Sequence, residues 1–125
     1  MAFCRVVKPG GIILLVVPER EACFDRDRPL TTLDHLIQDH ELGAHLSRNA
    51  HYVEYAELVD HASGNDAFHR ALVLAGKDYS IHFHVWTGET FLEHVSAVKR
   101  RYGLPIELIA AIRGKGELVA VFRSR

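Results

Sequence analysis

Residues 5–18, with the sequence RVVKPGGIILLVVP, constrain the fold more than any other stretch of this chain. The turn Lys8-Pro9-Gly10-Gly11 must interrupt a helix, because proline cannot continue one and glycine adopts positive φ at little cost. An apolar run over 12–17 follows at once and shows no alternation of polar and apolar residues. Such a run is typical of a strand covered on both faces, as in a parallel sheet flanked by helices. We therefore expect a helix that ends near Lys8 and a buried strand over 12–17.

Length, charge and cysteine usage narrow the class of protein. The 125 residues suffice for one domain with its own core. A net charge of -1 does not favour electrostatic binding to nucleic acid. The run 12–17 is far shorter than the roughly 20 apolar residues of a membrane span, and no signal segment precedes it. Cys4 and Cys23 lack the spacing of a zinc site or a disulfide framework. We expect one cytoplasmic domain over 1–125, with no nucleic acid and no membrane as partners.

The middle of the chain has helical spacing of its apolar residues. A helix capped by Thr31 or Thr32 should end near Gly43. Further helices are expected after Asn49 and after Asp66. These helices lie between the apolar run and the C-terminal third, so the segment resembles an insertion in the fold.

The C-terminal third has stronger local signals. Aromatic and β-branched residues predict an extended segment over 79–86, after which Thr87 can cap an amphipathic helix. Residues 106–112 and 117–122 predict an antiparallel hairpin around the turn Gly114-Lys115-Gly116.

The turn and strand of 5–18, followed by helices and a closing hairpin, resemble the C-terminal part of S-adenosylmethionine-dependent methyltransferases of the Rossmann-like class. In that family such a turn comes directly before the fifth strand, and the sixth and seventh strands form the closing hairpin. The stretches PEREACFDRDRPLTTLDHLIQDH and IHFHVWTGETFLEHV are also similar to a bacterial subgroup of these enzymes. The resemblance implies an α/β fold: the C-terminal portion of a methyltransferase sheet, with one buried strand, inserted helices and the hairpin.

The cofactor-binding half of that family has no counterpart in this sequence. In the family, a glycine-rich turn after the first strand and an acidic residue at the end of the second hold S-adenosylmethionine. Here Gly10-Gly11 precedes a strand and Gly114-Lys115-Gly116 joins two, so no cofactor-binding residue is assigned. We expect an incomplete methyltransferase domain that is not catalytic alone and binds no cofactor by itself, although its full-length relatives use S-adenosylmethionine.

The strand over 12–17 would lack the neighbour that a fourth strand provides in that family. An apolar, unpaired sheet edge favours pairing with another chain. We therefore expect association through this edge or the flanking helix faces, most simply as a twofold homodimer.

The residues expected at the acceptor pocket come from two segments. His82 and His84 would lie on one side of the extended segment together with Trp86, and either histidine could act as the base that takes a proton from the methyl acceptor. Four charged residues follow the carboxyl end of the first strand, and the arginines among them could bind an anionic substrate group. The same residues could instead form a solvated ion-pair loop. They are Arg20, Asp25, Arg26 and Arg28.

His35 is also assigned to the substrate side. It has the i, i+4 spacing to Asp39 that brings helical side chains together, a pairing that is usually a surface hydrogen bond. The methyltransferase interpretation assigns no metal ligand.

Two alternatives remain open. The spacing Gly76-x5-His82-x-His84-x4-Glu89 fits the first metal motif of cupin barrels, in which two histidines and a glutamate bind a divalent ion. The closing glycine of that motif would fall on Ser96, and its second half with a later histidine is not found. The other alternative is a non-catalytic, oligomeric interaction module.

Overall fold

The computed structural model describes residues 3–125, and their internal contacts divide them into two compact units. The first unit combines the segment up to Cys23 with Trp86–Arg125, and the second is Phe24–Val85. Each unit has its own apolar core. The expectation of one domain over 1–125 stays a prediction.

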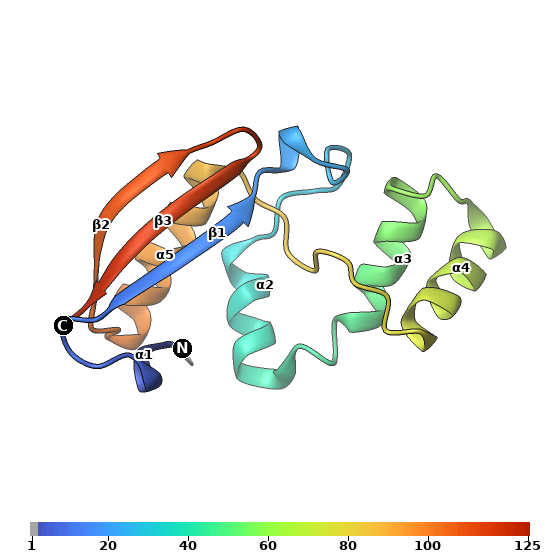
Figure 1. Ribbon diagram of the computed structural model, residues 1–125. Coiled ribbons are helices and arrows are strands. Elements are labelled where there is room, and N and C mark those ends of the chain that lie inside the picture. The colour runs from blue at the N-terminus through green and yellow to red at the C-terminus, as the bar shows by residue number, and fades with distance from the viewer. Residues whose placement is uncertain (1–2) are drawn as a thin grey trace. The chain divides into compact units, whose positions relative to one another are not determined.

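The first unit contains a three-stranded sheet within the described residues, in the order β1-β3-β2. The strands are β1 (Ile12–Pro18), β2 (Ile106–Arg113) and β3 (Glu117–Ser124). The central strand β3 is antiparallel to both neighbours, so β1 and β2 run parallel to one another without touching (Figure 1). The hairpin expected from the sequence is confirmed, and Gly116 adopts the positive φ of 89° that its turn requires.

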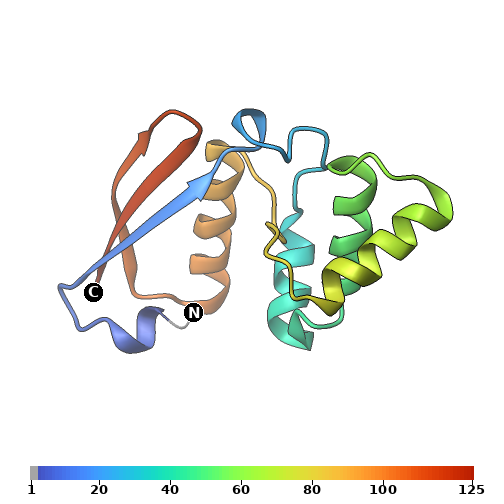
Figure 2. The same cartoon turned by 45° about the vertical axis from the view of Figure 1, so that its right-hand side comes forward.

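Helix α5 (Gly88–Tyr102) covers one face of this sheet (Figures 1 and 2). Phe91 of α5 packs on the inward-facing residues of the three strands: Ile13, Ile106, Leu118, Ala120 and Phe122. The helix begins where the sequence predicts, because Thr87 accepts a hydrogen bond from the Thr90 amide and the Thr90 side chain accepts one from the Thr87 amide. It ends at Gly103, whose φ of 61° is left-handed.

The other face of β1 is exposed, which corrects the expectation of a strand covered on both faces. Ile12, Leu14 and Val16 are 54%, 60% and 51% exposed, whereas Ile13 between them is 7% exposed. Successive side chains of a strand point to opposite faces, so an unbroken apolar run supplies both faces with apolar residues. Among the described residues, only one face of β1 is buried. The strand also lies at the sheet edge, as expected.

The turn before β1 is anchored to the end of β3. Helix α1 (Phe3–Val6) ends ahead of Lys8, as the sequence predicts, although the earlier part of the expected helix lies outside the described residues. The Gly10 amide donates to the Ser124 carbonyl at 2.8 Å, and the Ser124 amide donates to the Gly11 carbonyl at 2.9 Å. The turn Lys8-Pro9-Gly10-Gly11 is therefore bonded to the end of β3 and helps to fix the register between β1 and β3.

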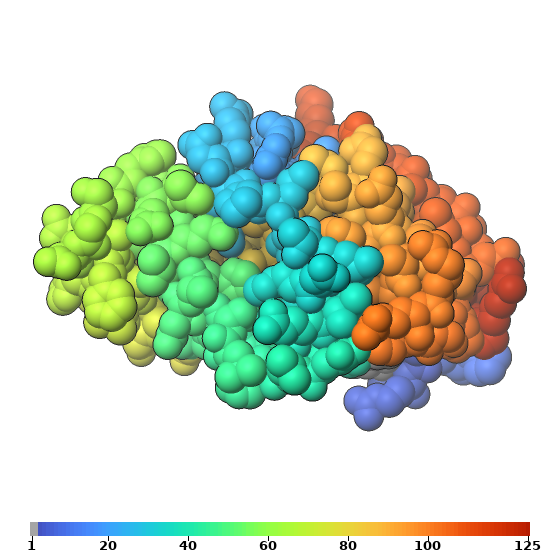
Figure 3. Space-filling model, turned by 180° about the vertical axis from the view of Figure 1, so that it is seen from behind, coloured from blue at the N-terminus to red at the C-terminus, as the bar shows by residue number. Residues whose placement is uncertain are grey.

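The second unit is helical. Helix α2 (Leu33–Gln38) passes into a π-helical turn over Asp39–Gly43, and α3 (Arg48–Leu58) and α4 (Gly64–Gly76) follow. The predicted helices are confirmed, although α3 begins one residue before Asn49 and α4 two residues before Asp66. Helices α3 and α4 pack side by side (Figure 3). Their contact is built from small and aromatic residues: Tyr52, Tyr55, Ala56, Ala67, Ala71 and Leu74.

The segment over 79–86, predicted to be extended, has an irregular backbone and joins no sheet among the described residues. Its backbone groups bind elsewhere in the second unit instead of a neighbouring strand. The Thr31 amide donates to the Val85 carbonyl at 2.8 Å, and the Val85 amide donates to the Thr31 hydroxyl at 2.8 Å. Aromatic and β-branched composition favoured a strand, but these tertiary bonds determine the path.

Among residues 3–125, none of the helices combines the length and the apolar character that crossing a bilayer requires.

Two isoleucines of β2 provide a test of this arrangement. Ile106 is 7% exposed under α5, whereas Ile112 of the same strand is 59% exposed. We expect Ile106→Ala to lower the free energy of unfolding by about 2–5 kcal/mol, because it leaves a cavity in the core. Ile112→Ala should change it by only about 0.5 kcal/mol. Urea unfolding followed by circular dichroism measures both, and equal effects would contradict a sheet with one covered face.

A buried arginine network and a candidate metal centre

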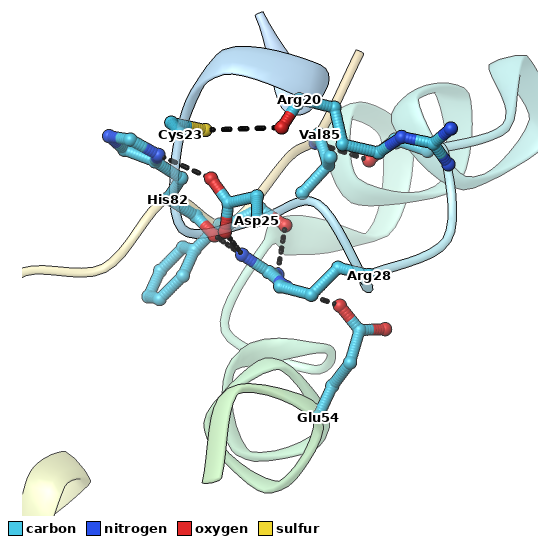
Figure 4. A network of polar contacts seen from close by, with 9 residues as sticks. Arg20, Cys23, Asp25, Arg28, Glu54, His82 and Val85 are labelled. Atoms are coloured by element: carbon cyan, nitrogen blue, oxygen red, sulfur yellow. Dashed lines mark hydrogen bonds and ion pairs between the residues drawn. The ribbon is translucent and has the colours of Figure 1, made fainter. Parts of the chain in front are cut away.

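Arg28 lies at the centre of a polar network in the second unit (Figure 4). Its side chain is fully buried, and its Nη1 donates to Oδ1 of Asp25 at 2.7 Å. Its Nε donates to Oε1 of Glu54 at 2.7 Å, so helix α3 supplies a second carboxylate. The backbone carbonyls of His82 and Phe83 accept from Nη1 and Nη2 at 2.6 and 3.5 Å. A buried guanidinium is tolerated only when it is bonded in this way.

Asp25 divides its two oxygens between Arg28 and His82. While Oδ1 accepts from Arg28, Oδ2 lies 2.6 Å from Nδ1 of His82. Asp25 is 2% exposed, whereas the His82 side chain is 37% exposed and stacks on the Phe24 ring at 4.9 Å. An ionised carboxylate can only accept, so Nδ1 of His82 carries the proton. Asp25 therefore orients the His82 ring through Nδ1, which is the arrangement of the aspartate and histidine in a catalytic triad.

A second group gathers three histidines around Asp39. Nε2 of His35 lies 3.1 Å from Nε2 of His51 and 3.3 Å from Oδ2 of Asp39. Nε2 of His84 lies 2.9 Å from the same Oδ2. The ligand atoms of all four residues lie within 4.8 Å of one another, so they could hold a metal ion. We call His35, Asp39, His51 and His84 the histidine–aspartate cluster.

Local structure explains how each member of the cluster is placed. The Thr32 hydroxyl caps α2 by accepting from the His35 amide, and His35 and Asp39 are then one helical turn apart. His51 belongs to the first turns of α3, and its ring stacks on Phe83 with centroids 5.3 Å apart. His84 is held by the two hydrogen bonds between Val85 and Thr31. Three separate segments of the second unit therefore meet at this cluster.

Burial and neighbouring groups shift the pKa values of two members of the cluster, Asp39 and His51. Burial opposes ionisation of Asp39, but hydrogen bonds with Ser47 and His84, together with electrostatic contributions from His35 and His84, lower the pKa of this carboxyl group. Burial, with further contributions from His35 and His84, lowers the pKa of His51 to about 4. At neutral pH the His51 ring is therefore uncharged and able to offer a lone pair.

A surface pocket of about 220 Å³ lies beside this cluster. The pocket is lined by His35, Gln38, Asp39, Gly43, Leu46 and Ser47. The Ser47 hydroxyl donates to Oδ1 of Asp39 at 2.7 Å, which leaves Oδ2 facing the histidines. Small molecules can therefore reach one side of the cluster from solvent.

The residues predicted for the acceptor pocket are distributed over both units. Asp25, Arg26, Arg28, His35, His82 and His84 belong to the second unit, and Arg20 and Trp86 to the first. Arg20 pairs with Glu21, and the Trp86 ring packs on Phe91 with centroids 5.3 Å apart. Arg26 is exposed. The substrate and base roles of these residues stay predictions.

His82 and His84 do not share the partners expected from an extended strand. His82 contacts Asp25 and His84 contacts Asp39, so each imidazole has a different carboxylate. Glu89, the third residue of the cupin-type motif, belongs to the first unit and pairs with Arg113 at 2.7 Å. The groups of potential metal ligands among residues 3–125 do not include Glu89, and the sheet there is not a barrel.

His51 is the member of the cluster that sequence reasoning missed. The spacing of His35 and Asp39 was visible in the sequence, and His84 was singled out for another role. His51 lies 12 positions beyond Asp39 and 33 before His84, so no short motif joins them. The only signal is the surplus of nine histidines, which does not tell which of them meet.

No protein-family model, curated protein or solved structure matches this chain.

The arginine network gives a direct stability prediction. We expect Arg28→Ala to lower the free energy of unfolding by about 3–5 kcal/mol, because it leaves Asp25 buried without its cation. Arg26→Ala removes the same type of side chain from an exposed position in the same loop and should change stability by about 0.5 kcal/mol or less. Chemical denaturation of both variants tests this, and a small effect at Arg28 would contradict the network.

Proposed function

We propose that this chain forms the acceptor-side, C-terminal part of a Rossmann-like S-adenosylmethionine-dependent methyltransferase whose cofactor-binding half lies outside these 125 residues. The observation that carries the proposal is the arrangement of the sheet. Strands β1 and β2 are parallel, and β3 lies between them as the only antiparallel strand among those described.

This arrangement fits the border of a larger, mostly parallel sheet. The chain leaves β1, passes through α5 and returns as β2 in the same direction, which is the crossover connection of α/β folds. Mixed sheets of such folds commonly add an antiparallel strand near one edge. A free-standing meander would place β2 beside β1, which is not the order found here.

The exposed apolar face of the sheet and the unpaired edge of β1 support the same proposal. In doubly wound sheets, helices cover both faces and further strands continue the parallel array. Here Ile12, Leu14 and Val16 of β1 are more than half exposed, and so is Ile112 of β2. The opposite edge of β1 pairs with no described strand. A fourth strand and its helix would bury this face and edge.

The Asp25–His82 pair favours His82 as the base. Methyl transfer breaks the sulfonium S–C bond and forms a bond from carbon to an acceptor oxygen or nitrogen. The acceptor loses a proton, which Nε2 of His82 would take while S-adenosylhomocysteine leaves uncharged at sulfur. Asp25 orients the ring and stabilises the imidazolium that results. His84 contacts the histidine–aspartate cluster instead, which makes it the weaker candidate.

The anionic part of an acceptor could be bound by arginines of the loop after β1. The donors of Arg28 are used by Asp25, Glu54 and backbone carbonyls, so Arg28 would act by positioning Asp25. Arg26 is exposed and could bind a carboxylate or phosphate. Arg20, His35 and Trp86 remain proposed substrate contacts.

Binding of S-adenosylmethionine tests this proposal. We expect calorimetry to detect no micromolar binding to the 125-residue chain, because it has no glycine-rich turn that leads from a strand into a helix. The same chain extended by the reading frame upstream should contain that turn and bind the cofactor. In the extended protein, His82→Gln should lower kcat for methyl transfer by about 100-fold or more without changing the KM for the cofactor. Micromolar binding to the chain alone, or an upstream frame without the turn, would refute the proposal.

For the chain by itself we propose a twofold dimer through the edge of β1. An exposed apolar edge favours pairing with an identical edge, and a twofold axis makes the two strands antiparallel. We expect sedimentation to show a dimer at micromolar concentration. Leu14→Lys should yield monomers, because it places a charge in the pairing strand. Ile112→Lys, on the other edge strand, should remain dimeric; a monomeric parent chain would exclude this contact.

A further inference from the structure

The histidine–aspartate cluster brings four potential ligand atoms to one point. Oδ2 of Asp39 and the Nε2 atoms of the three histidines are the atoms that approach one another at 2.9–3.3 Å. A tetrahedral zinc ion with bonds of about 2.0–2.2 Å separates its ligand atoms by about 3.3–3.5 Å. The three printed contacts join His35 to His51, His35 to Asp39 and His84 to Asp39, and each needs to change by only tenths of an ångström to match this spacing. The remaining pairs of ligand atoms lie within 4.8 Å of one another.

We propose that His35, Asp39, His51 and His84 bind one divalent transition-metal ion of the zinc type, in a four-coordinate site that joins α2, α3 and the segment before Val85. The site does not depend on the methyltransferase proposal, because each of its ligands lies within the second unit.

The ligand types select the class of metal. Three imidazoles and one carboxylate suit Zn²⁺ and its neighbours in the first transition row. Magnesium and calcium prefer sites made of oxygen atoms, and this cluster offers a single carboxylate. The ligand atoms are free of sulfur, so the site would not resemble a thiolate zinc finger. With four protein ligands and no open coordination position, the ion would have a structural role.

The residues around the cluster hold its side chains in place, as residues next to the ligands do in known metal sites. Ser47 binds Oδ1 of Asp39 at 2.7 Å and so fixes which carboxylate oxygen faces the histidines. The His51 ring is 8% exposed and stacked on Phe83, which restricts its rotation. No arginine or lysine among the described residues forms an ion pair with Asp39, so its charge is available to a metal cation.

Metal titration of tag-free protein tests the proposal. The protein is first dialysed against a chelator and then titrated with Zn²⁺, and separately with Co²⁺ as a spectroscopic probe. We expect one equivalent of either ion to bind, the Co²⁺ form to show the intense visible absorption of tetrahedral coordination, and the melting temperature to rise with Zn²⁺. Binding of less than one equivalent, or octahedral Co²⁺ spectra, would overturn the four-coordinate site.

Variants separate this site from adventitious binding. Asp39→Asn and His84→Gln should weaken Zn²⁺ binding by at least about 100-fold, and Ser47→Ala by about 10-fold, because it loosens the carboxylate. His69→Gln is the matched control, since His69 is exposed on α4, away from the cluster. Equal affinities of the Asp39, His84 and His69 variants would refute the assignment.

A measurement on the unmodified chain covers the case in which a variant fails to fold. In nitrogen-15 spectra, Zn²⁺ should shift the Nε2 resonances of His35, His51 and His84 and leave His69 unchanged. If the cluster is held by hydrogen bonds alone, these resonances will not respond to one equivalent of Zn²⁺, and the proposal fails. Absence of S-adenosylmethionine binding to any form of the protein would leave this result unaffected.

Discussion

The buried charge of Arg28 is the constraint on which the second unit depends. A guanidinium removed from water must have its donors bonded, or its desolvation is not compensated. The bonding partners come from the loop after β1, from α3 and from the irregular segment at His82 and Phe83. The hydrogen bonds of this one side chain therefore hold three segments together, and both candidate sites take residues from these segments or from the position next to them.

Phe83 explains why two histidines that are two residues apart serve different sites. Its ring packs against the core of the second unit and stacks on His51. Its carbonyl and that of His82 bind Arg28, so this stretch is held by tertiary contacts rather than by a neighbouring strand. The alternation of a strand no longer applies, and His82 reaches Asp25 while His84 reaches Asp39.

The parts of the fold that sequence reasoning predicted are those with local causes. The Thr87 cap, the amphipathic helix α5 and the glycine-containing hairpin each depend on residues close together in the chain. The exposure of Leu14 could not be predicted in this way, because it depends on what covers the sheet. The sequence allows Arg28 to contact a substrate anion or to belong to a solvated ion-pair loop, and only the fold shows that it is buried. The cluster around Asp39 required four residues spread over 50 positions to meet.

Charge balance distinguishes the two aspartates at the candidate sites. Each carboxylate is anchored by one oxygen and presents the other to histidine. The anchor of Asp25 is the cation Arg28, so the charge of this carboxylate is compensated within the chain. The anchor of Asp39 is the neutral hydroxyl of Ser47, and the imidazoles around it bring no fixed charge. A buried carboxylate in such surroundings is most stable beside a cation. The two sites therefore differ in chemistry for a physical reason: one is balanced within the chain, and the other gains from a bound metal ion.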